Sequence, residues 1–456
     1  MMKIKTKMSF QDPNIRINNF EEVSFGYNNS EAILEASRCL DCKHAPCVKG
    51  CPVGINIPGF IKEISNNNLD KAYDILTDQN AFPGICGRVC PQETQCESVC
   101  VRGIKGEPVG IGNLERYVSD NVAEKEIVVP IIQYEKVAVV GSGPAGLACS
   151  GVLAKKGYEV HLFEALHVAG GVLTYGIPEF RLPKRIVKKE VDQIRNLGVK
   201  IHLNTIIGKT KLIDELFEEG FKAVFIGSGA GLPKFMNIPG ENLNGVYSAN
   251  EFLTRVNLMK AYDKNYDTPL RKMKNVVVVG GGNVAMDAAR CAKRLGVEEV
   301  TIVYRRSEKE MPARLDEIHH AKEENIKFQL LTNPVKIISD EKNNVTGVEC
   351  IKMDLVESGG GRARPIEIPD SNFEIISDTV IMALGNHPNP LIPTSTDDIE
   401  VNQWGCFVVD ENLMTSKENV YAGGDAVTGA ATVILAMGAG KKAAYEIDKK
   451  LRNING

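Results

Sequence analysis

The sequence predicts an α/β fold in which two Rossmann-like domains follow a small α-helical domain. Two observations carry this prediction. A unit of strand, glycine-rich turn, helix and second strand occurs twice, at residues 135–165 and 275–306. Eight of the twelve cysteines lie between Cys39 and Cys100, in a region with few strand-like runs. This change along the chain indicates that separate domains follow one another.

The length of 456 residues suits two or three domains at about 150 residues each. We expect residues 1–130 to form the helical domain and residues 131–240 the first part of one Rossmann-like domain. Residues 241–384 would form the second Rossmann-like domain, and residues 385–456 would return to the first. The second domain is therefore predicted to be an insertion.

The helical domain contains the segment EAILEASR and a second helical segment at residues 57–80. Its first four cysteines follow the spacing Cx2Cx4Cx3CP, and they are Cys39, Cys42, Cys47 and Cys51. This spacing is close to the bacterial ferredoxin run Cx2Cx2Cx3CP, whose last cysteine ligates the other of two clusters. A second set follows at Cys86, Cys90, Cys96 and Cys100.

These thiols could hold a zinc ion, an iron-sulfur cluster or one another. Zinc accepts thiolates, but structural zinc sites usually pair two CxxC-like knuckles, and only Cys39 with Cys42 forms one. Disulfides are rare in a reducing cytosol, where we place the chain because it shows no secretory signal. Iron-sulfur clusters are favoured and zinc stays the alternative. The scattered Cys149, Cys291, Cys350 and Cys406 are expected to be core or incidental residues.

The first Rossmann-like unit has Gly141, Gly143 and Gly146 in GxGxxG order after the strand VAVV. Such glycines allow a tight turn, the approach of a pyrophosphate and close packing of helix on strand. Glu164 ends the second strand, where a carboxylate can accept hydrogen bonds from ribose hydroxyls. The unit predicts a dinucleotide site; a glycine turn without a ligand is the alternative.

The second unit has the GxGxxA variant, with Gly280, Gly282 and Ala285, and the predicted site includes Asn283 after the turn. Its second strand ends in Arg305 and Arg306 rather than in an acid. Guanidinium groups bind a 2'-phosphate, whereas a carboxylate would repel it. NADP(H) is therefore favoured over NAD(H). The alternative is that both arginines form a solvated strand end.

The composition excludes several classes of function. A charged fraction of 25%, a hydrophobic fraction of 43% and a net charge of -4 describe a soluble globular protein without a nucleic-acid surface. No run approaches the ~18 consecutive apolar residues of a membrane-spanning helix. We expect a cytoplasmic protein with no membrane contact. His319 and His320, in a segment that reads as helical over residues 308–324, are expected on a solvated face.

The C-terminal run from Asn419, NVYAGGDAVTGAATVILAMGAGKKAAYEI, resembles the closing FAD motif of two-dinucleotide-domain flavoprotein reductases. The resemblance implies that Gly424 and Asp425 lie near the ribityl and phosphate part of FAD, and that the NADP(H) domain is inserted into the FAD domain. FIGSGAG at 225–231 and IMALGNHP at 381–388 look like the strand ends near its two crossovers. Without this resemblance, Asp425 could be a turn residue or a helix N-cap.

Further motifs make the resemblance specific from about residue 30 to the end. They are the cysteine runs, GEPVGIGNLERYVSD, GSGPAGLA, GGVLTYGIPEFRLPK, GGGNVAMDAAR, YRRSEKEMPAR and AGGD. Together they resemble the small (beta) subunit of NADPH-dependent glutamate synthase. They are equally similar to the large subunit of the electron-bifurcating NADH-dependent reduced ferredoxin:NADP+ oxidoreductase, and the N-terminal half of dihydropyrimidine dehydrogenase is a further relative.

The resemblance implies two 4Fe-4S clusters with interleaved ligands. Cys39, Cys42 and Cys47 would join Cys100 on one cluster. The other would have the ligands Cys51, Cys90, Cys96 and, from GNLERY, Glu115. Glu115 could instead be a surface carboxylate. Cys86 departs from the family pattern; it is a bystander or, as the less favoured alternative, replaces Glu115.

The implied function is an oxidoreductase subunit that takes a hydride from NADPH to FAD and relays electrons through two clusters to a protein partner. Gly170, Gly171 and Tyr175 lie in a loop that this family keeps near the flavin. The partner would be the glutamate synthase large subunit. Alternatively, a small ferredoxin-reductase-like flavoprotein would complete a bifurcating or sulfide dehydrogenase-like enzyme. A third reading is a scaffold with structural or sensory clusters.

Overall fold

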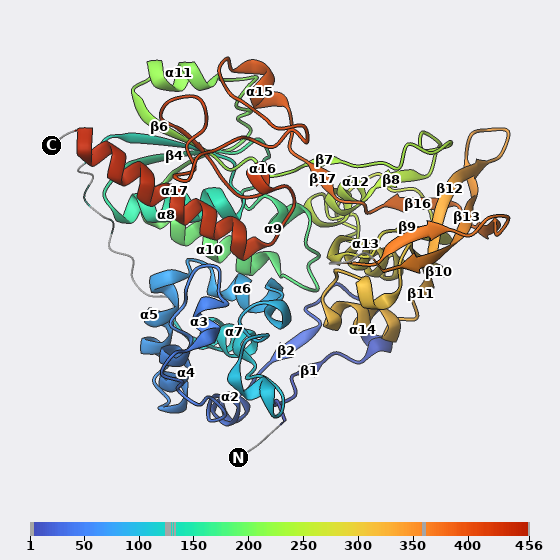
Figure 1. Ribbon diagram of the computed structural model, residues 1–456, viewed down its shortest axis with the longest axis horizontal. Coiled ribbons are helices and arrows are strands. Elements are labelled where there is room, and N and C mark those ends of the chain that lie inside the picture. Colours follow the sequence, from blue (N-terminus) through green and yellow to red (C-terminus); the bar gives the residue numbers. More distant parts are fainter. Residues whose placement is uncertain (1–3, 124–128, 130, 132–133, 358–361, 455–456) are drawn as a thin grey trace.

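The computed structural model describes residues 4–123, 129, 131, 134–357 and 362–454. It shows a helical N-terminal region and two sheet-containing regions (Figure 1). The region with the first sheet lies above the helices, and the region with the second sheet lies beside both. The predicted α/β fold is confirmed, while the predicted boundaries at residues 130, 240 and 384 stay predictions.

The N-terminal region consists of short helices and one two-stranded sheet. Its strands are β1 (Ser9–Phe10) and β2 (Ser24–Gly26). Its helices are α1 (Pro13–Arg16), α2 (Asn29–Ala36), α3 (Pro46–Lys49), α4 (Ile57–Ser65), α5 (Leu69–Gln79), α6 (Pro83–Val89) and α7 (Ile111–Asn121), with 3-10 turns η1 (Gln92–Thr94) and η2 (Val101–Ile104).

Local signals explain where these helices begin and end. Asn28 and Glu31 form a capping box at the start of α2, in which each side chain accepts a hydrogen bond from the backbone of the other residue. The segment predicted as helical at 57–80 divides into α4 and α5. It is broken at Asn67, whose φ of 56° is left-handed and ends the α4 helix.

The first sheet has five parallel strands in the order β18-β6-β3-β4-β5. The strands are β3 (Lys136–Val140), β4 (Glu159–Phe163), β5 (Lys200–His202), β6 (Phe221–Ile226) and β18 (Val420–Ala422). Their helices are α8 (Pro144–Lys155), α9 (Val172–Tyr175), α10 (Lys184–Asn196), α11 (Ile213–Glu218), α15 (Leu391–Ser395), α16 (Asp425–Thr428) and α17 (Val433–Ile454). The chain thus leaves this sheet after β6 and returns at β18, which confirms the predicted insertion.

The inserted region has a five-stranded parallel sheet in the order β11-β10-β9-β16-β8. Its strands are β8 (Val246–Ser248), β9 (Asn275–Val279), β10 (Glu299–Tyr304), β11 (Lys327–Leu330) and β16 (Thr379–Met382). An antiparallel sheet packs against it, with β12 (Thr332–Ser339), β13 (Val345–Val356), β14 (Arg364–Glu367) and β15 (Phe373–Ile376). The helices are α12 (Ala249–Leu253), a π turn η3 (Thr254–Leu258), α13 (Asn283–Arg294), η4 (Glu308–Glu310) and α14 (Leu315–Glu323), and β7 (Leu232–Pro233) pairs with β17 (Asn386–His387).

Residues 308–324 depart from the predicted single helix. They form the short turn η4 and then α14, because Pro312 cannot donate a backbone hydrogen bond inside a helix. His319 is exposed as expected, but the expectation for His320 is wrong. Only 6% of His320 is exposed, and its ring packs edge-on against Phe10 at a centroid distance of 4.8 Å.

The helical region and the first sheet share one continuous apolar core. Ile85 of α6, Leu114 of α7, Leu147 of α8 and Ile447 of α17 belong to it and are fully buried. Figure 1 shows α17 lying along α8 above the N-terminal helices. The prediction of four buried core cysteines is confirmed for Cys149, Cys291, Cys350 and Cys406.

Buried ion pairs join the inserted region to the rest of the chain. Arg16 at the end of α1 pairs with Glu324 at 2.7 Å, and Arg290 and Arg294 of α13 pair with the same carboxylate at 2.8 and 2.7 Å. Arg181, which precedes α10, pairs with Asp287 of α13 at 2.7 Å. The N-terminal segment and the loop before α10 are therefore fastened to one face of the inserted region.

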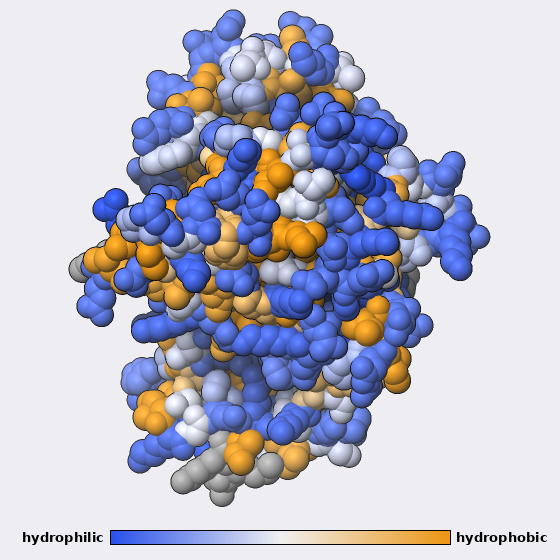
Figure 2. Space-filling view, turned by 90° about the vertical axis from the view of Figure 1, so that its right-hand side faces the viewer, coloured by the Kyte–Doolittle hydropathy of each residue, from blue (hydrophilic) through white to orange (hydrophobic). Residues whose placement is uncertain are grey.

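The side of the molecule on which the inserted region lies, seen in Figure 2, is mainly hydrophilic, with apolar side chains in separate patches. Within the described ranges, no helix combines the length and the apolar character needed to cross a bilayer.

Candidate functional site

The first glycine turn lies between β3 and α8. Gly141 has a φ of 94°, and a Cβ there would lie 2.6 Å from the Gly227 carbonyl oxygen. A Cβ on Gly146 would lie 1.8 Å from the Gly141 carbonyl oxygen, so α8 can pack this closely only with glycine. A Cβ on Gly143 would meet nothing within 4 Å. The open backbone at the start of α8 can therefore receive a phosphate.

Glu164 lies at the end of β4, and its carboxylate holds the glycine turn. One oxygen accepts hydrogen bonds from the Ser142 backbone N–H at 2.9 Å and from the Ser142 hydroxyl. The other accepts from the Leu166 backbone N–H at 2.8 Å. A carboxylate offers about four lone-pair sites, so acceptor capacity for a ribose remains. Sequence reasoning predicted the ribose contact and missed the contact with Ser142.

The loop after β4 folds over the same turn. A Cβ on Gly171 would lie 2.8 Å from the Gly143 Cα, and the Gly170 N–H donates to the Ser142 hydroxyl at 2.9 Å. Burial raises the pKa of Tyr175 to about 12, and the charges of Asp425 and Glu164 contribute to the rise. Tyr175 therefore lies close enough to both carboxylates to feel their charge.

Lys184 at the start of α10 fastens this loop and was missed in the sequence. Its ammonium group donates to the carbonyl oxygens of Leu173 and Leu182, both at 3.0 Å, and to that of Ile177. Burial lowers the pKa of Lys184 to about 8. Its place at the end of GGVLTYGIPEFRLPK was the available signal, since an ammonium can satisfy several carbonyls of a tight loop.

The C-terminal motif closes the other side of the turn. Gly424 has a φ of 69° and lies against Ala145 of α8, and a Cβ on Gly440 would lie 2.0 Å from the Ala145 carbonyl oxygen. Asp425 begins α16 and accepts a hydrogen bond from the Ala431 N–H at 3.2 Å. Burial raises the pKa of Asp425. Residues almost 300 positions apart thus surround one glycine turn.

The second glycine turn lies between β9 and α13. Gly280 has a φ of 147°, and a Cβ there would lie 2.4 Å from the Ala383 carbonyl oxygen. A Cβ on Gly282, at the start of α13, would meet only Pro312 Cγ, at an ordinary contact distance of 3.8 Å, and Ala285 is fully buried. The Asn283 side-chain oxygen accepts from the Arg314 N–H at 2.9 Å, so it fixes the segment before α14. This turn has the same open helix start as the first.

The two predicted phosphate-binding arginines follow β10. Arg305 is exposed, and no ion pair or hydrogen bond of its side chain is found within the described part of the chain. Arg306 is half-buried and donates through Nε to the Ala363 carbonyl oxygen at 2.8 Å. The N–H groups of its two terminal nitrogens remain available to donate hydrogen bonds. Both guanidinium groups can therefore offer hydrogen bonds to an anion.

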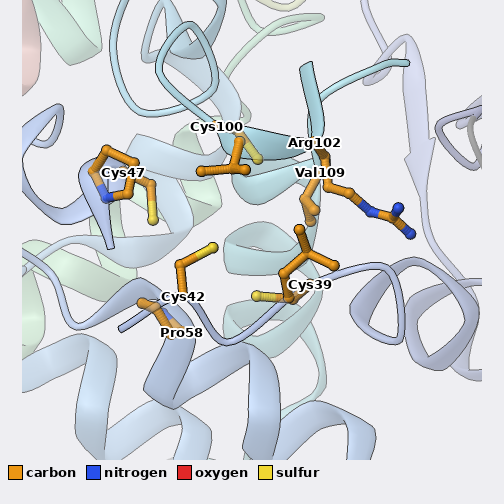
Figure 3. A pocket seen from close by; sticks show the side chains of 10 residues that line it. Cys39, Cys42, Cys47, Pro58, Cys100, Arg102 and Val109 are labelled. Atoms are coloured by element: carbon orange, nitrogen blue, oxygen red, sulfur yellow. The ribbon is translucent and has the colours of Figure 1, made fainter. Parts of the chain in front are cut away.

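The first group of thiols lines a pocket at the protein surface. Cys39, Cys42, Cys47 and Cys100 lie around one open space (Figure 3), which measures about 320 Å³ including its mouth. Burial, followed by the neighbouring thiols Cys100 and Cys39, raises the pKa of Cys47 to about 11. The structure thus brings Cys100 to three cysteines that lie more than fifty residues earlier.

The second group lies deeper, between α6, α7 and the turns after α3 and α6. It comprises Cys51, Cys90, Cys96 and Glu115, with Cys86 beside them. Burial raises the pKa of Cys96, and the charges of Glu97, Glu115, Cys51 and Cys90 add to the rise. Burial raises the pKa of Glu115 to about 8, although Asn80 donates a hydrogen bond to it at 2.6 Å. Glu115 is only 6% exposed and is not a surface carboxylate.

Both groups suit iron-sulfur clusters chemically. Buried thiols lose a proton only where a positive charge compensates, and cluster iron supplies that charge. All twelve cysteines are free thiols. In the described residues, no three histidine, cysteine, aspartate or glutamate side chains are grouped so as to hold a single metal ion. The role of the named residues as ligands stays a prediction.

Two protein families match the chain. Residues 16–127 match the 4Fe-4S cluster domain described as dihydropyrimidine dehydrogenase domain II, and residues 135–440 match the pyridine nucleotide-disulphide oxidoreductases. Together with the two glycine turns, these matches define the class of protein as a flavoprotein oxidoreductase that uses a pyridine nucleotide and has an N-terminal iron-sulfur domain. The chain belongs to the family of the small subunit of NADPH-dependent glutamate synthase.

The glutamate synthase (NADPH) small chain of Azospirillum brasilense is 36% identical over 95% of this chain and 92% of its own length. The Escherichia coli small chain is 33% identical over 94% and 93%. The NADP(+)-dependent formate dehydrogenase subunit beta of Moorella thermoacetica is 38% identical over 90% of this chain, which spans 60% of that protein.

Solved structures agree on the fold. Mycobacterium tuberculosis FprA in complex with NADPH has a TM-score of 0.60 at 20% identity, covering 71% of this chain and 86% of that one. Thioredoxin reductase of T. acidophilum has a TM-score of 0.51 at 23% identity, covering 70% and 99%.

Proposed function

We propose that this chain is the electron-input subunit of a glutamate synthase of the NADPH type. When bound, FAD would accept a hydride from NADPH, and two 4Fe-4S clusters would pass the electrons singly to a partner subunit. The observation that carries the proposal is the presence of two separate groups of cluster-type ligands beside two complete dinucleotide turns. The protein supplies the binding, the orientation and the electrostatics.

The residues around each glycine turn indicate which of the two nucleotides that turn would bind. The first turn, with Glu164 and Asp425, would hold FAD, whose pyrophosphate would lie at Gly143 and the start of α8. Gly171 and Tyr175 would cover it. The second turn would hold NADP(H) at Gly282 and Asn283, and Arg305 and Arg306 would bind its 2'-phosphate.

The positions of the two ligand groups support an order of electron transfer. The second group lies against α17, where Cys86 Sγ is 3.5 Å from Met437 Sδ. The start of α17 follows Asp425 closely, so this group is on the flavin side. The first group opens at the surface, beside the partly exposed Leu40 and Val101. Electrons would therefore enter the second cluster and leave from the first.

The partner is inferred from the match in length. The chain spans 92% and 93% of the two glutamate synthase small chains, whereas it spans only part of the formate dehydrogenase subunit. We infer that a large subunit converts glutamine and 2-oxoglutarate to glutamate with these electrons. A co-purified small ferredoxin-reductase-like flavoprotein, identified by its mass, would instead favour the bifurcating enzyme.

Protein purified without oxygen is expected to be brown and to contain about eight iron atoms per chain. NADPH is expected to bleach its bound flavin, which a scaffold with purely structural clusters would not allow. Iron analysis and the visible spectrum check both expectations. Zinc in place of iron would contradict the cluster assignment.

Replacement of Glu115 with alanine is expected to change the signal of one cluster and to leave the other unchanged. A carboxylate is a harder ligand than a thiolate, so its loss alters the electronic structure of the iron that it binds. Electron paramagnetic resonance of the reduced protein separates the two clusters. Glu107→Ala, at an exposed acid of the same domain, is the control. Two unchanged signals would transfer the ligand role to Cys86.

A further inference from the structure

Two side chains compete for the fourth ligand place of the second cluster, and a third side chain contacts both. Asn80 follows α5 and is fully buried. Its amide nitrogen donates to a Glu115 carboxylate oxygen at 2.6 Å. Its amide oxygen lies 3.6 Å from the Cys86 sulfur. Asn80 was not singled out in the sequence.

The backbone fixes the orientation of the Asn80 amide. The Phe82 backbone N–H donates to the amide oxygen at 2.9 Å, so the oxygen must face Phe82 and Cys86. The amide NH2 is then directed to Glu115, for which the described residues provide no other hydrogen-bond donor. A charged carboxylate accepts a hydrogen bond from this donor more strongly than a neutral carboxyl group does. The amide therefore favours Glu115 as a charged ligand.

The surroundings of Cys86 have the opposite polarity. Its sulfur contacts two acceptors, the Asn80 amide oxygen and Met437 Sδ at 3.5 Å. The single S–H hydrogen can donate to one of these acceptors at a time, and neither acceptor favours the thiolate form in which a cluster ligand binds. Cys86 lies in α6, one helical turn before the C-cap residue Cys90, so it is near enough to the second group to be a candidate ligand.

We propose that Asn80 is a positioning residue that assigns the fourth ligand place of the second cluster to Glu115 and withholds Cys86 from it. This inference rests on the proposed function, because it requires a cluster at the second group. The Asn80 amide selects between the two ligands because its NH2 group faces Glu115 and its oxygen faces Cys86. Cys86 is then a reserve ligand that binds iron only when Glu115 is released.

The test compares Asn80→Asp, Cys86→Ser and the double variant by electron paramagnetic resonance and iron content. Asn80→Asp keeps the oxygen that accepts from the Phe82 N–H, but it places a second carboxylate oxygen against Glu115. The Glu115 carboxylate should then be displaced, because it loses its donor and meets a like charge. Asn68→Asp, at the exposed start of the same helix, adds the same charge as a control.

We expect Cys86→Ser and Asn68→Asp to match the unaltered protein. Asn80→Asp should retain about eight iron atoms with a changed second-cluster signal, because Cys86 takes the vacant place. The double variant should lose about one iron atom per chain and show a three-iron signal when oxidised. The inference is overturned if Asn80→Asp keeps the original signal, or if the double variant matches Asn80→Asp.

Two controls keep the result interpretable. Should Asn80→Asp fail to fold by circular dichroism, Asn80→Ser replaces it, since a hydroxyl can still accept from the Phe82 N–H but is too short to reach Glu115. The same outcomes then apply. An unaltered protein without a second-cluster signal would overturn the proposed function, whereas two clusters with no response to Asn80 would overturn this inference alone.

Discussion

Replacement of Glu324 with glutamine is expected to destabilise the inserted region by about 3–5 kcal/mol, because it leaves buried charges without a partner. The Glu324 carboxylate is fully buried and pairs with Arg16, Arg290 and Arg294. Glutamine has the same shape but no charge, so the arginines would keep the desolvation cost without its compensation. The thermal unfolding of this region should shift down by about 10 °C.

The neighbouring residue provides a matched control for this prediction. The Glu323 side chain is 34% exposed and also pairs with Arg16, at 2.7 Å. Glu323→Gln should change the unfolding temperature by about 2 °C or less, because partly exposed ion pairs contribute little. Differential scanning calorimetry measures both variants. Equal shifts for the two would mean that the buried network does not stabilise the junction.

Replacement of Arg305 and Arg306 together with alanine is expected to raise the KM for NADPH by about 100-fold. Each guanidinium group would lose charge-assisted hydrogen bonds to the 2'-phosphate worth about 1.5 kcal/mol, and the two losses together correspond to a change on the order of 100-fold. NADH lacks this phosphate, so its KM should change by about twofold or less. Reduction of an artificial acceptor with each nucleotide gives both values.

The net charge of the variant needs its own control. Lys336 and Lys352 are exposed on β12 and β13 of the neighbouring antiparallel sheet, and their replacement with alanine also removes two positive charges. That variant should retain the preference of the enzyme for NADPH. Equal losses with NADPH and NADH in the arginine variant would show that the arginines do not read the phosphate.

The two glycine turns could be predicted because their signals are local. Gly146 is required by a contact inside one unit, with the Gly141 carbonyl oxygen, and Gly141 and Gly280 have a positive φ that the turn itself imposes, although their closest neighbours, Gly227 and Ala383, lie far along the chain. The insertion was also predictable, since the return motif at Asp425 has a recognisable pattern. Helix ends were less predictable: residues 57–80 and 308–324 were each expected to be helical, whereas the structure divides them at Asn67 and near Pro312.

Contacts between distant segments could not be predicted from residue patterns. Arg16 and Glu324 are 308 positions apart, and the buried ring of His320 packs against Phe10, at the opposite end of the chain's first 320 residues. Nor does the spacing of the cysteines reveal that Asn80 lies between Glu115 and Cys86. Such contacts depend on how the N-terminal helices pack against α17 and α14.

The sequence by itself determined the two nucleotide-binding units, their nested order and the supply of thiols near the N-terminus. The tertiary structure alone decided which thiols share a pocket, which carboxylate is buried beside them and which charges are neutralised at the junction. The physical reason is the distance along the chain over which each interaction acts. Backbone geometry repeats over two to four residues and leaves a periodic pattern, whereas desolvation and side-chain polarity act between whatever surfaces packing brings together.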